Sequence, residues 1–101
     1  MKSGYKVEWS DEAITQLSKI YDYLEQNWTG REIRKFSVRL ERVIELIAQY
    51  PRMFAVSQHK KKVRRCILTK QNSLYYKVDR HRIFIVTLFD NRQDPKKLKL
   101  P

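Results

Sequence analysis

Basic side chains gather in three clusters in the second half of the chain, and their chemistry suits a polyanionic partner. In chain order they are Lys60, Lys61 and Lys62, then Arg64 and Arg65, and finally Arg92, Lys96, Lys97 and Lys99. Guanidinium and ammonium groups bind phosphate and carboxylate oxygens through charge-assisted hydrogen bonds. The clusters therefore predict a surface that binds nucleic acid or an acidic protein segment.

The two halves of the chain differ sharply in charge. Residues 1–51 carry eight Lys/Arg and eight Asp/Glu, whereas residues 52–101 carry fourteen Lys/Arg and three Asp/Glu. The whole formal net charge of +11 therefore lies in the second half. Folding alone does not require this separation, but it would strengthen the attraction of a polyanion, which supports the same prediction.

Other chemical groupings in the sequence are weak. His59 and His81 have no cysteine or carboxylate at metal-ligand spacing, so we expect no metal site and no cofactor. Cys66, the single cysteine, lies in an apolar segment and is expected to be a core residue rather than a nucleophile. Because one cysteine cannot form an internal disulfide, a reducing, cytoplasmic setting is favoured. No segment approaches the ~20 apolar residues of a membrane span, so no membrane partner is expected.

A helix hairpin is predicted over about residues 10–50. Residues 5–9 alternate apolar and polar side chains as a strand does, and Ser10 follows as a helix N-cap. Thr29 and Glu32 have the spacing of a capping box, and Gly30 is expected to let the chain turn. Pro51 ends the second helix. The apolar stripes, at steps of three and four, are Ile14, Leu17, Tyr21, Leu24 and Trp28, then Ile33, Phe36, Leu40, Val43, Ile47 and Tyr50.

A basic sheet is predicted over about residues 52–101. Its strands are expected at residues 63–68, 74–78 and 83–89, with a tight turn at Asp79, Arg80 and His81. The last strand is almost continuously apolar, as expected of a central strand covered on both faces. Arg64 and Arg65 are adjacent on a strand, so their side chains should point to opposite faces. The element order predicts an α+β fold in a single domain, residues 1–101, with an antiparallel helix hairpin on a mostly antiparallel sheet.

The order of four segments resembles the RelE/ParE superfamily of bacterial type II toxins. The segments are VEWSDEA at 7–13, YPR at 50–52, LYYKV at 74–78 and IFIVTLFDNRQDP at 83–95. The resemblance implies a small basic toxin that inhibits growth and serves plasmid stabilisation. It also implies a cognate antitoxin, whose extended and acidic segment folds across exposed apolar grooves and a basic face of the toxin.

The superfamily contains two mechanisms, and one of them is enzymatic. RelE-like members are ribosome-dependent endoribonucleases, which cleave mRNA with arginines, lysines and a late tyrosine. Of three distinctive positions, Arg92 keeps its arginine, whereas Ser73 and Leu98 replace an arginine and the tyrosine. Cleavage by 2′-hydroxyl attack needs proton transfer, for which the sequence offers no convincing group. If the chain is a ribonuclease, its candidate residues are Arg65, Arg92, Lys60, Lys61 and Lys62.

The long hairpin and the RQDP sequence at 92–95 favour the ParE branch, whose members are described as inhibitors of DNA gyrase. The leading prediction is therefore a protein-binding inhibitor that is not an enzyme. Its predicted target-binding residues are Lys60, Lys61, Lys62, Arg64, Arg65, Arg92, Lys96 and Lys97. Two alternatives remain open: an endoribonuclease acting on the ribosome and mRNA, and a non-toxic nucleic-acid-binding module.

Overall fold

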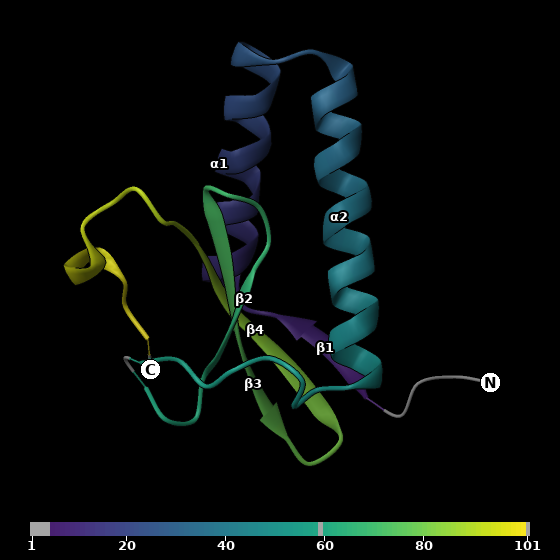
Figure 1. Ribbon diagram of the computed structural model, residues 1–101, viewed down its shortest axis with the longest axis vertical. Helices are drawn as coiled ribbons and strands as arrows, with labels where there is room; N and C mark the ends of the chain where they lie inside the picture. The colour runs from purple at the N-terminus through teal and green to yellow at the C-terminus, as the bar shows by residue number, and fades with distance from the viewer. Residues whose placement is uncertain (1–4, 59, 101) are drawn as a thin grey trace.

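A helix hairpin stands on a four-stranded sheet in this structure, a computed structural model that describes residues 5–58 and 60–100. His59 lies outside the described residues. The elements, in chain order, are β1 (Lys6–Trp9), α1 (Asp11–Asn27), α2 (Gly30–Gln49), β2 (Arg64–Ile67), β3 (Asn72–Asp79), β4 (Arg82–Asp90) and a 3₁₀ turn (Pro95–Lys97). Figure 1 shows this arrangement, which confirms the predicted α+β fold.

The sheet has the strand order β1-β4-β3-β2. β1 pairs in parallel with β4, and the other two pairings are antiparallel, which confirms a mostly antiparallel sheet. Val86 has no partner in the register, because Tyr75 pairs with Thr87 while Tyr76 pairs with Ile85. This bulge lies in β4, the central strand.

Ser10 connects β1, α1 and β4. Its backbone N–H donates to the Ile85 carbonyl at 3.0 Å, which extends the parallel pairing by one residue. Its hydroxyl accepts the Ala13 N–H at 2.9 Å and donates to the Val86 carbonyl at 2.6 Å. The predicted N-cap is therefore confirmed, and the same side chain fixes the start of α1 on the sheet.

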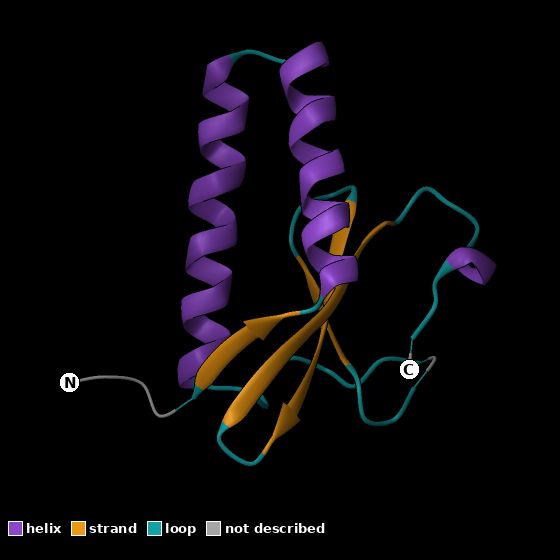
Figure 2. Ribbon diagram, turned by 180° about the vertical axis from the view of Figure 1, so that it is seen from behind, coloured by secondary structure: helices purple, strands orange, loops and turns teal. Residues whose placement is uncertain are grey.

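The two helices pack against each other through an aromatic pair and a hydrogen bond. The rings of Tyr21 and Phe36 meet edge to face with centroids 5.4 Å apart, and the Tyr21 hydroxyl lies 2.6 Å from Ser37 Oγ. Figure 2 shows the helices side by side, with their connected ends extending beyond the sheet. Neither helix in the described part of the chain is long and apolar enough to cross a membrane.

Both faces of the sheet carry buried apolar side chains. Tyr76 lies in the main core under the helices, whereas Tyr75 lies in a smaller cluster with Val63 and Val86. The buried members of the main core are Ala13, Phe36, Val43, Ile47, Cys66, Leu68, Leu74, Tyr76, Ile83, Ile85 and Leu88. This confirms that β4 is covered on both faces and that Cys66 is a core residue, and burial raises the pKa of its thiol.

Three residues of the predicted apolar stripes lie at the surface. Ile14, Trp28 and Tyr50 are 53%, 51% and 59% exposed, so their assignment to the core is wrong. In α1 the fully buried residue is Ala13, one position before Ile14, because the Ser10 contacts set the rotation of the helix. Trp28 and Tyr50 are C-cap residues and lie just past the last residue of their helices.

The connection between the helices also differs from the prediction. Thr29 is the N-cap residue of α2, but its hydroxyl bonds to the Glu32 carboxylate and makes no capping bond to the backbone. Gly30 is the first residue of α2 and does not have a positive φ. A Cβ at this position would meet no described atom within 4 Å. The turn therefore does not require glycine.

We expect Gly30→Ala to stabilise the protein by about 0.4–1 kcal/mol, since alanine reduces the entropy of the unfolded chain and no clash opposes it. The measurement is urea unfolding followed by circular dichroism. A lower unfolding midpoint in the alanine variant would show that this position needs glycine after all.

Tyr76 links β3 to the end of α2. Its hydroxyl donates to the Pro51 carbonyl at 2.7 Å, and its side chain is fully buried. Burial raises the pKa of Tyr76 to about 12. The neutral phenol is therefore favoured in the folded state.

We expect Tyr76→Phe to lower the free energy of unfolding by about 1–2 kcal/mol, because the Pro51 carbonyl loses its donor. Since the folded pKa is above the unfolded value, the contribution of Tyr76 is fully present below pH ~10 and is lost as the pH rises towards ~12. Urea unfolding at pH 7 and pH 10.5 tests both statements. The exposed Tyr50 provides the matched control, and an equal loss in Tyr50→Phe would contradict the assignment.

Candidate functional site

A groove of about 810 Å³ lies between the helix hairpin, along α1 and the first half of α2, and a surface formed by residues 69–72, the end of β4 and the chain that follows it. Its apolar lining includes Leu24, Trp28, Phe36 and Leu98. The charged lining residues are Glu12, Lys19, Glu32, Lys35, Arg39, Lys70, Asp90, Arg92, Lys97 and Lys99. Seven of these are basic and three are acidic, so the groove combines apolar walls with an excess of positive charge.

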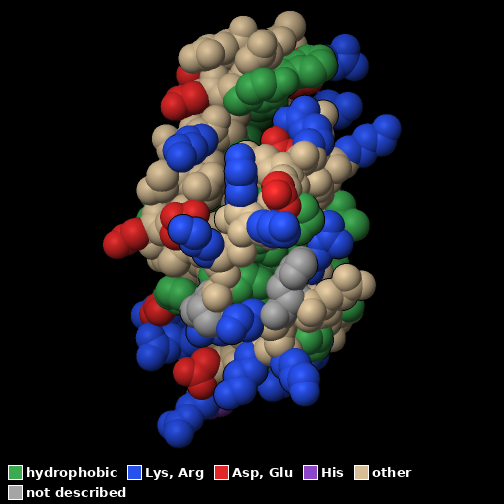
Figure 3. All heavy atoms as spheres, turned by 90° about the vertical axis from the view of Figure 1, so that its left-hand side faces the viewer, with side chains coloured by type: hydrophobic (Ala, Val, Ile, Leu, Met, Phe, Trp, Pro, Cys, Tyr) green, Lys and Arg blue, Asp and Glu red, His purple; other side chains and the backbone are tan. Residues whose placement is uncertain are grey.

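The surrounding surface carries the same charge. Figure 3 views the side of the molecule that bears the C-terminal segment, and Lys and Arg side chains are spread over this face, with acidic side chains between some of them. Hydrophobic side chains are visible among these basic groups. Such a surface can attract an anionic partner at a distance and bury apolar groups on contact.

Arg92 is held in a fixed position at the groove. Its backbone N–H and Nε donate to Asp90 Oδ1 at 2.9 and 3.0 Å, and its Nη2 donates to Asp90 Oδ2 at 2.8 Å. This contact lowers the pKa of Asp90 and raises that of Arg92, and the nearby Tyr23 of α1 raises the Arg92 pKa further. Arg92 is therefore a permanently charged group whose orientation is set by the Asp90 carboxylate.

A second network holds the neighbouring residue, Asn91. Arg65 Nε donates to Ser73 Oγ at 3.1 Å, and Ser73 Oγ donates to Asn91 Oδ1 at 2.8 Å. Arg65 Nη2 lies 3.4 Å from the same Asn91 oxygen. Ser73 is fully buried, so a guanidinium from β2 lies over the position where RelE-like members were expected to carry their arginine. The network joins β2, β3 and the residue that precedes Arg92.

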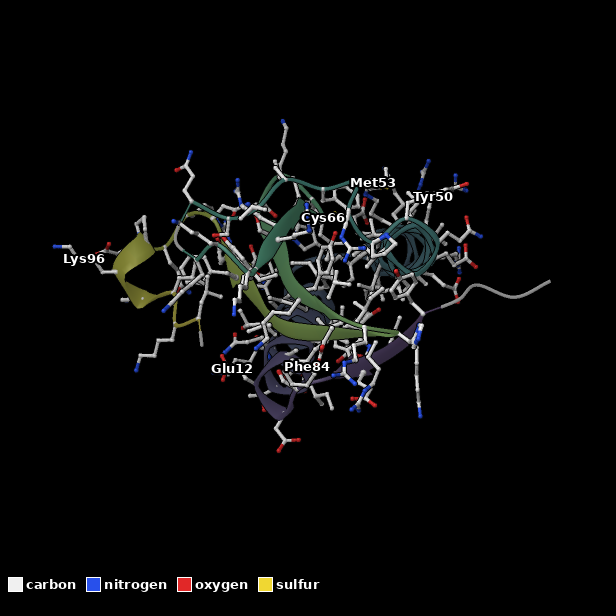
Figure 4. All side chains as sticks on the ribbon, turned by 90° about the horizontal axis from the view of Figure 1, so that it is seen from below. Glu12, Tyr50, Met53, Cys66, Phe84 and Lys96 are labelled. Carbon is white, nitrogen blue, oxygen red and sulfur yellow. The ribbon has the colours of Figure 1, made fainter. Side chains whose placement is uncertain are left out.

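The predicted site residues do not form one surface. Of the eight, Arg92 and Lys97 line the groove. Lys96 points away from the sheet, as Figure 4 shows. Arg64 turns back to the Phe54 carbonyl at 2.7 Å, and Arg65 reaches Asn91, so the expected divergence of this pair is confirmed. The exposed lysines 60–62 lie in the loop before β2, outside the groove lining. That these residues bind a target stays a prediction.

One basic surface was missed by the sequence analysis. It lies on α2 around a second hollow of about 500 Å³, and its residues are Arg31, Arg34, Lys35, Val38, Arg39 and Arg42. The steps of three and four between them place them on one helix face. The charge count over residues 1–51 did not reveal these cations, because an equal number of carboxylates in the same half brings the net charge to zero. The helical spacing of the cations was the signal that could have revealed it.

Metal chemistry has no visible basis in the described residues. In residues 5–58 and 60–100, no group of three or more His, Cys, Asp or Glu side chains is placed to hold a metal ion. The groove lining offers cations, carboxylates and apolar groups instead. Its chemistry is that of a binding surface for an anionic, partly apolar ligand.

The family of the chain follows from comparison with known proteins. A family model described as the ParE toxin of the type II toxin-antitoxin system parDE matches residues 7–95. The chain belongs to this family. The match begins at the second residue of β1 and ends at the first residue of the 3₁₀ turn, so it includes Arg92 but not the groove residues Lys97, Leu98 and Lys99.

Solved structures share the fold of this ParE-family toxin. The chromosomal ParDE system of P. aeruginosa matches with a TM-score of 0.71 and 19% identity, over 86% of this chain and 96% of that chain. The YoeB dimer of Staphylococcus aureus matches with a TM-score of 0.61 and 14% identity, over 90% and 100%. A copper-bound mutant toxin of Helicobacter pylori matches with a TM-score of 0.61 and 18% identity, over 86% and 94%. Among curated protein sequences, none matches the toxin significantly.

We expect Asn91→Ala to lower the free energy of unfolding by about 1–2 kcal/mol, because buried Ser73 loses its acceptor and Arg65 loses one partner. Urea unfolding measures this change. The exposed Gln93, two positions further on, provides the control, and Gln93→Ala should stay within about 0.5 kcal/mol of the parent. Equal values for the two variants would mean that the network contributes little to stability.

Proposed function

We propose that this toxin arrests growth by binding DNA gyrase and that a cognate antitoxin neutralises it. Membership of the ParE family supports the toxin role. The chemistry around Arg92 favours binding over catalysis, and this is the main support for the proposal. There, a guanidinium held by Asp90 stands in a groove whose described lining contains no histidine or cysteine.

The groove offers little for acid–base catalysis. Among the described residues that line it, none is histidine or cysteine. Asp90 is bonded to Arg92 and Glu32 to Thr29, and these contacts lower the pKa of both carboxyl groups. Glu12 accepts a hydrogen bond from Gln16. A carboxylate with a lowered pKa is a weak base near neutral pH, so Asp90 and Glu32 are poor candidates for removing a ribose proton.

The same groove suits an antitoxin segment. Trp28 and Tyr23 are exposed apolar side chains on its rim, and large exposed aromatic groups are typical of surfaces that a partner covers. The seven basic lining residues would attract an acidic segment. We infer that the antitoxin contributes an amphipathic, acidic segment that covers the apolar walls and neutralises the cations.

The decisive experiment compares two activities of the purified toxin. Gyrase supercoiling of relaxed plasmid DNA is measured with increasing toxin, and mRNA cuts on stalled ribosomes are mapped by primer extension. We expect inhibition of supercoiling and no cuts in the A-site codon. Codon-phased cuts without inhibition of gyrase would overturn the proposal.

We expect Arg92→Ala to relieve growth arrest on induction and to weaken gyrase inhibition at least tenfold, a loss of about 1.4 kcal/mol or more. The matched control is Arg82→Ala. Arg82 also forms an exposed ion pair, with Glu8 at 3.1 Å, but it lies outside the groove. The two arginine side chains are similarly exposed, at 57% for Arg92 and 60% for Arg82. Full toxicity in the Arg92 variant would remove this residue from the proposed site.

The ribosome-dependent endoribonuclease stays a second candidate because of one observation. Arg65 and Arg92 both lie next to Asn91, the first through a side-chain contact and the second along the chain. Two guanidinium groups in this position could stabilise charge on a phosphate during cleavage. If A-site cuts appear, we expect them to be lost in both Arg65→Ala and Arg92→Ala.

A further inference from the structure

The outer face of α2 carries a row of cations that the groove does not explain. The row comprises Arg31, Arg34, Lys35, Arg39 and Arg42, and together with Val38 it surrounds the hollow of about 500 Å³. Only Lys35 and Arg39 also line the groove. We call the five cations the α2 row. Three of them, Arg31, Arg34 and Arg42, lie outside the groove lining.

Among the described residues, no member of the α2 row forms an ion pair with a carboxylate, although the charge of Arg31 helps to lower the pKa of nearby Glu32. Within the described part of the chain, the ion pairs join Arg82 to Glu8 and Arg92 to Asp90. Arg39 donates to the backbone carbonyls of Leu68 and Ile67 at 3.0 and 3.3 Å, which carry no net charge. Of the described residues around the hollow, none bears a carboxylate. The fold does not require such a concentration of arginines, but it would attract an anionic partner and bind it.

We propose that the α2 row binds the phosphate backbone of duplex DNA. From Arg31 to Arg42 the helix rises about 16 Å at 1.5 Å per residue. Duplex DNA presents one charge per about 1.7 Å of its axis, so this length faces several phosphates in a fixed arrangement. A guanidinium group can donate two parallel hydrogen bonds to the oxygens of one phosphate, and four of the five cations are arginines. The inference does not depend on gyrase being the target of the toxin.

The composition of the row favours a duplex over other anions. Sites for single-stranded nucleic acid add aromatic side chains on which bases stack, and the described residues of the row include none. An acidic peptide needs apolar anchors for tight binding, and Val38 is the single apolar residue in this lining. A regular row of cations matches the rigid, regular backbone of a duplex.

The test measures DNA binding and its dependence on salt. A labelled duplex of about 20 base pairs is titrated with toxin at several salt concentrations between about 50 and 200 mM, and binding is followed by fluorescence anisotropy. The variant combines Arg31→Gln, Arg34→Gln and Arg42→Gln, which spares the two residues shared with the groove. We expect at least tenfold weaker binding and a salt slope that is smaller by about 2–3.

A matched control removes the same charge elsewhere. It combines Lys6→Gln, Lys77→Gln and Arg80→Asn, at the start of β1, the end of β3 and the turn after it. Asparagine suits Arg80 because this residue has a φ of 54°. Figure 1 shows this turn at the end of the molecule opposite the start of α2. We expect the control to keep the salt slope of the parent.

Three results would overturn the proposal. Equal losses in the two triple variants would mean that binding follows total charge rather than the α2 row. Equally tight binding of a single strand of the same length would exclude recognition of the duplex. Displacement of the DNA by an equally charged poly-glutamate peptide at the same concentration would assign the row to an acidic polypeptide. Circular dichroism checks folding, and if the α2 variant is unfolded the single change Arg34→Glu carries the same test.

Discussion

The parallel pairing of β1 with β4 is the interaction on which the rest of the structure depends. It joins segments more than seventy positions apart, with Lys6 opposite Arg82 and Trp9 opposite Ile85. Ser10 extends this pairing and caps α1 at the same point, so the start of the hairpin is fixed to the central strand. Because the position and rotation of α1 follow from these bonds, so does the overhang of the hairpin beyond the sheet, and this overhang forms one wall of the groove.

The other wall depends on where β4 ends. Its apolar residues fill both layers of the core, and its last residue, Asp90, already faces the groove. Asn91 is bonded to β3 through Ser73, while Arg92 is bonded to Asp90. The strand that organises the core therefore also positions Arg92, the cation proposed to bind the target. A mutation in the core of β4 would affect the groove directly, because the core residue Leu88 and the buried Thr87 also line it.

The sequence patterns predicted the elements better than their contacts. Alternation identified β1, capping identified Ser10, and a nearly continuous apolar run identified the central strand, because these signals depend on local chemistry. Periodicity misplaced Trp28, since it marks one face of a helix but not how far a neighbouring sheet extends along it. It also misplaced Ile14, because the Ser10 contacts set the rotation of α1. The bonds from Arg65 to Ser73 and Asn91 require the register of three strands, which no local pattern contains. The α2 row was accessible from spacing alone and was hidden by summing charge over a whole half of the chain.

The two basic surfaces differ in chemistry but share residues, and this has a consequence for how they would work together. The groove combines cations with apolar walls, whereas the α2 row is almost purely cationic. Lys35 and Arg39 line both, so an acidic segment in the groove would neutralise two of the five cations of the row. Neutralising one phosphate-binding cation reduces the salt slope by about one, so DNA affinity should fall when the groove is occupied. If both proposals hold, thermodynamic reciprocity requires that bound DNA weakens the hold of the acidic segment by the same factor.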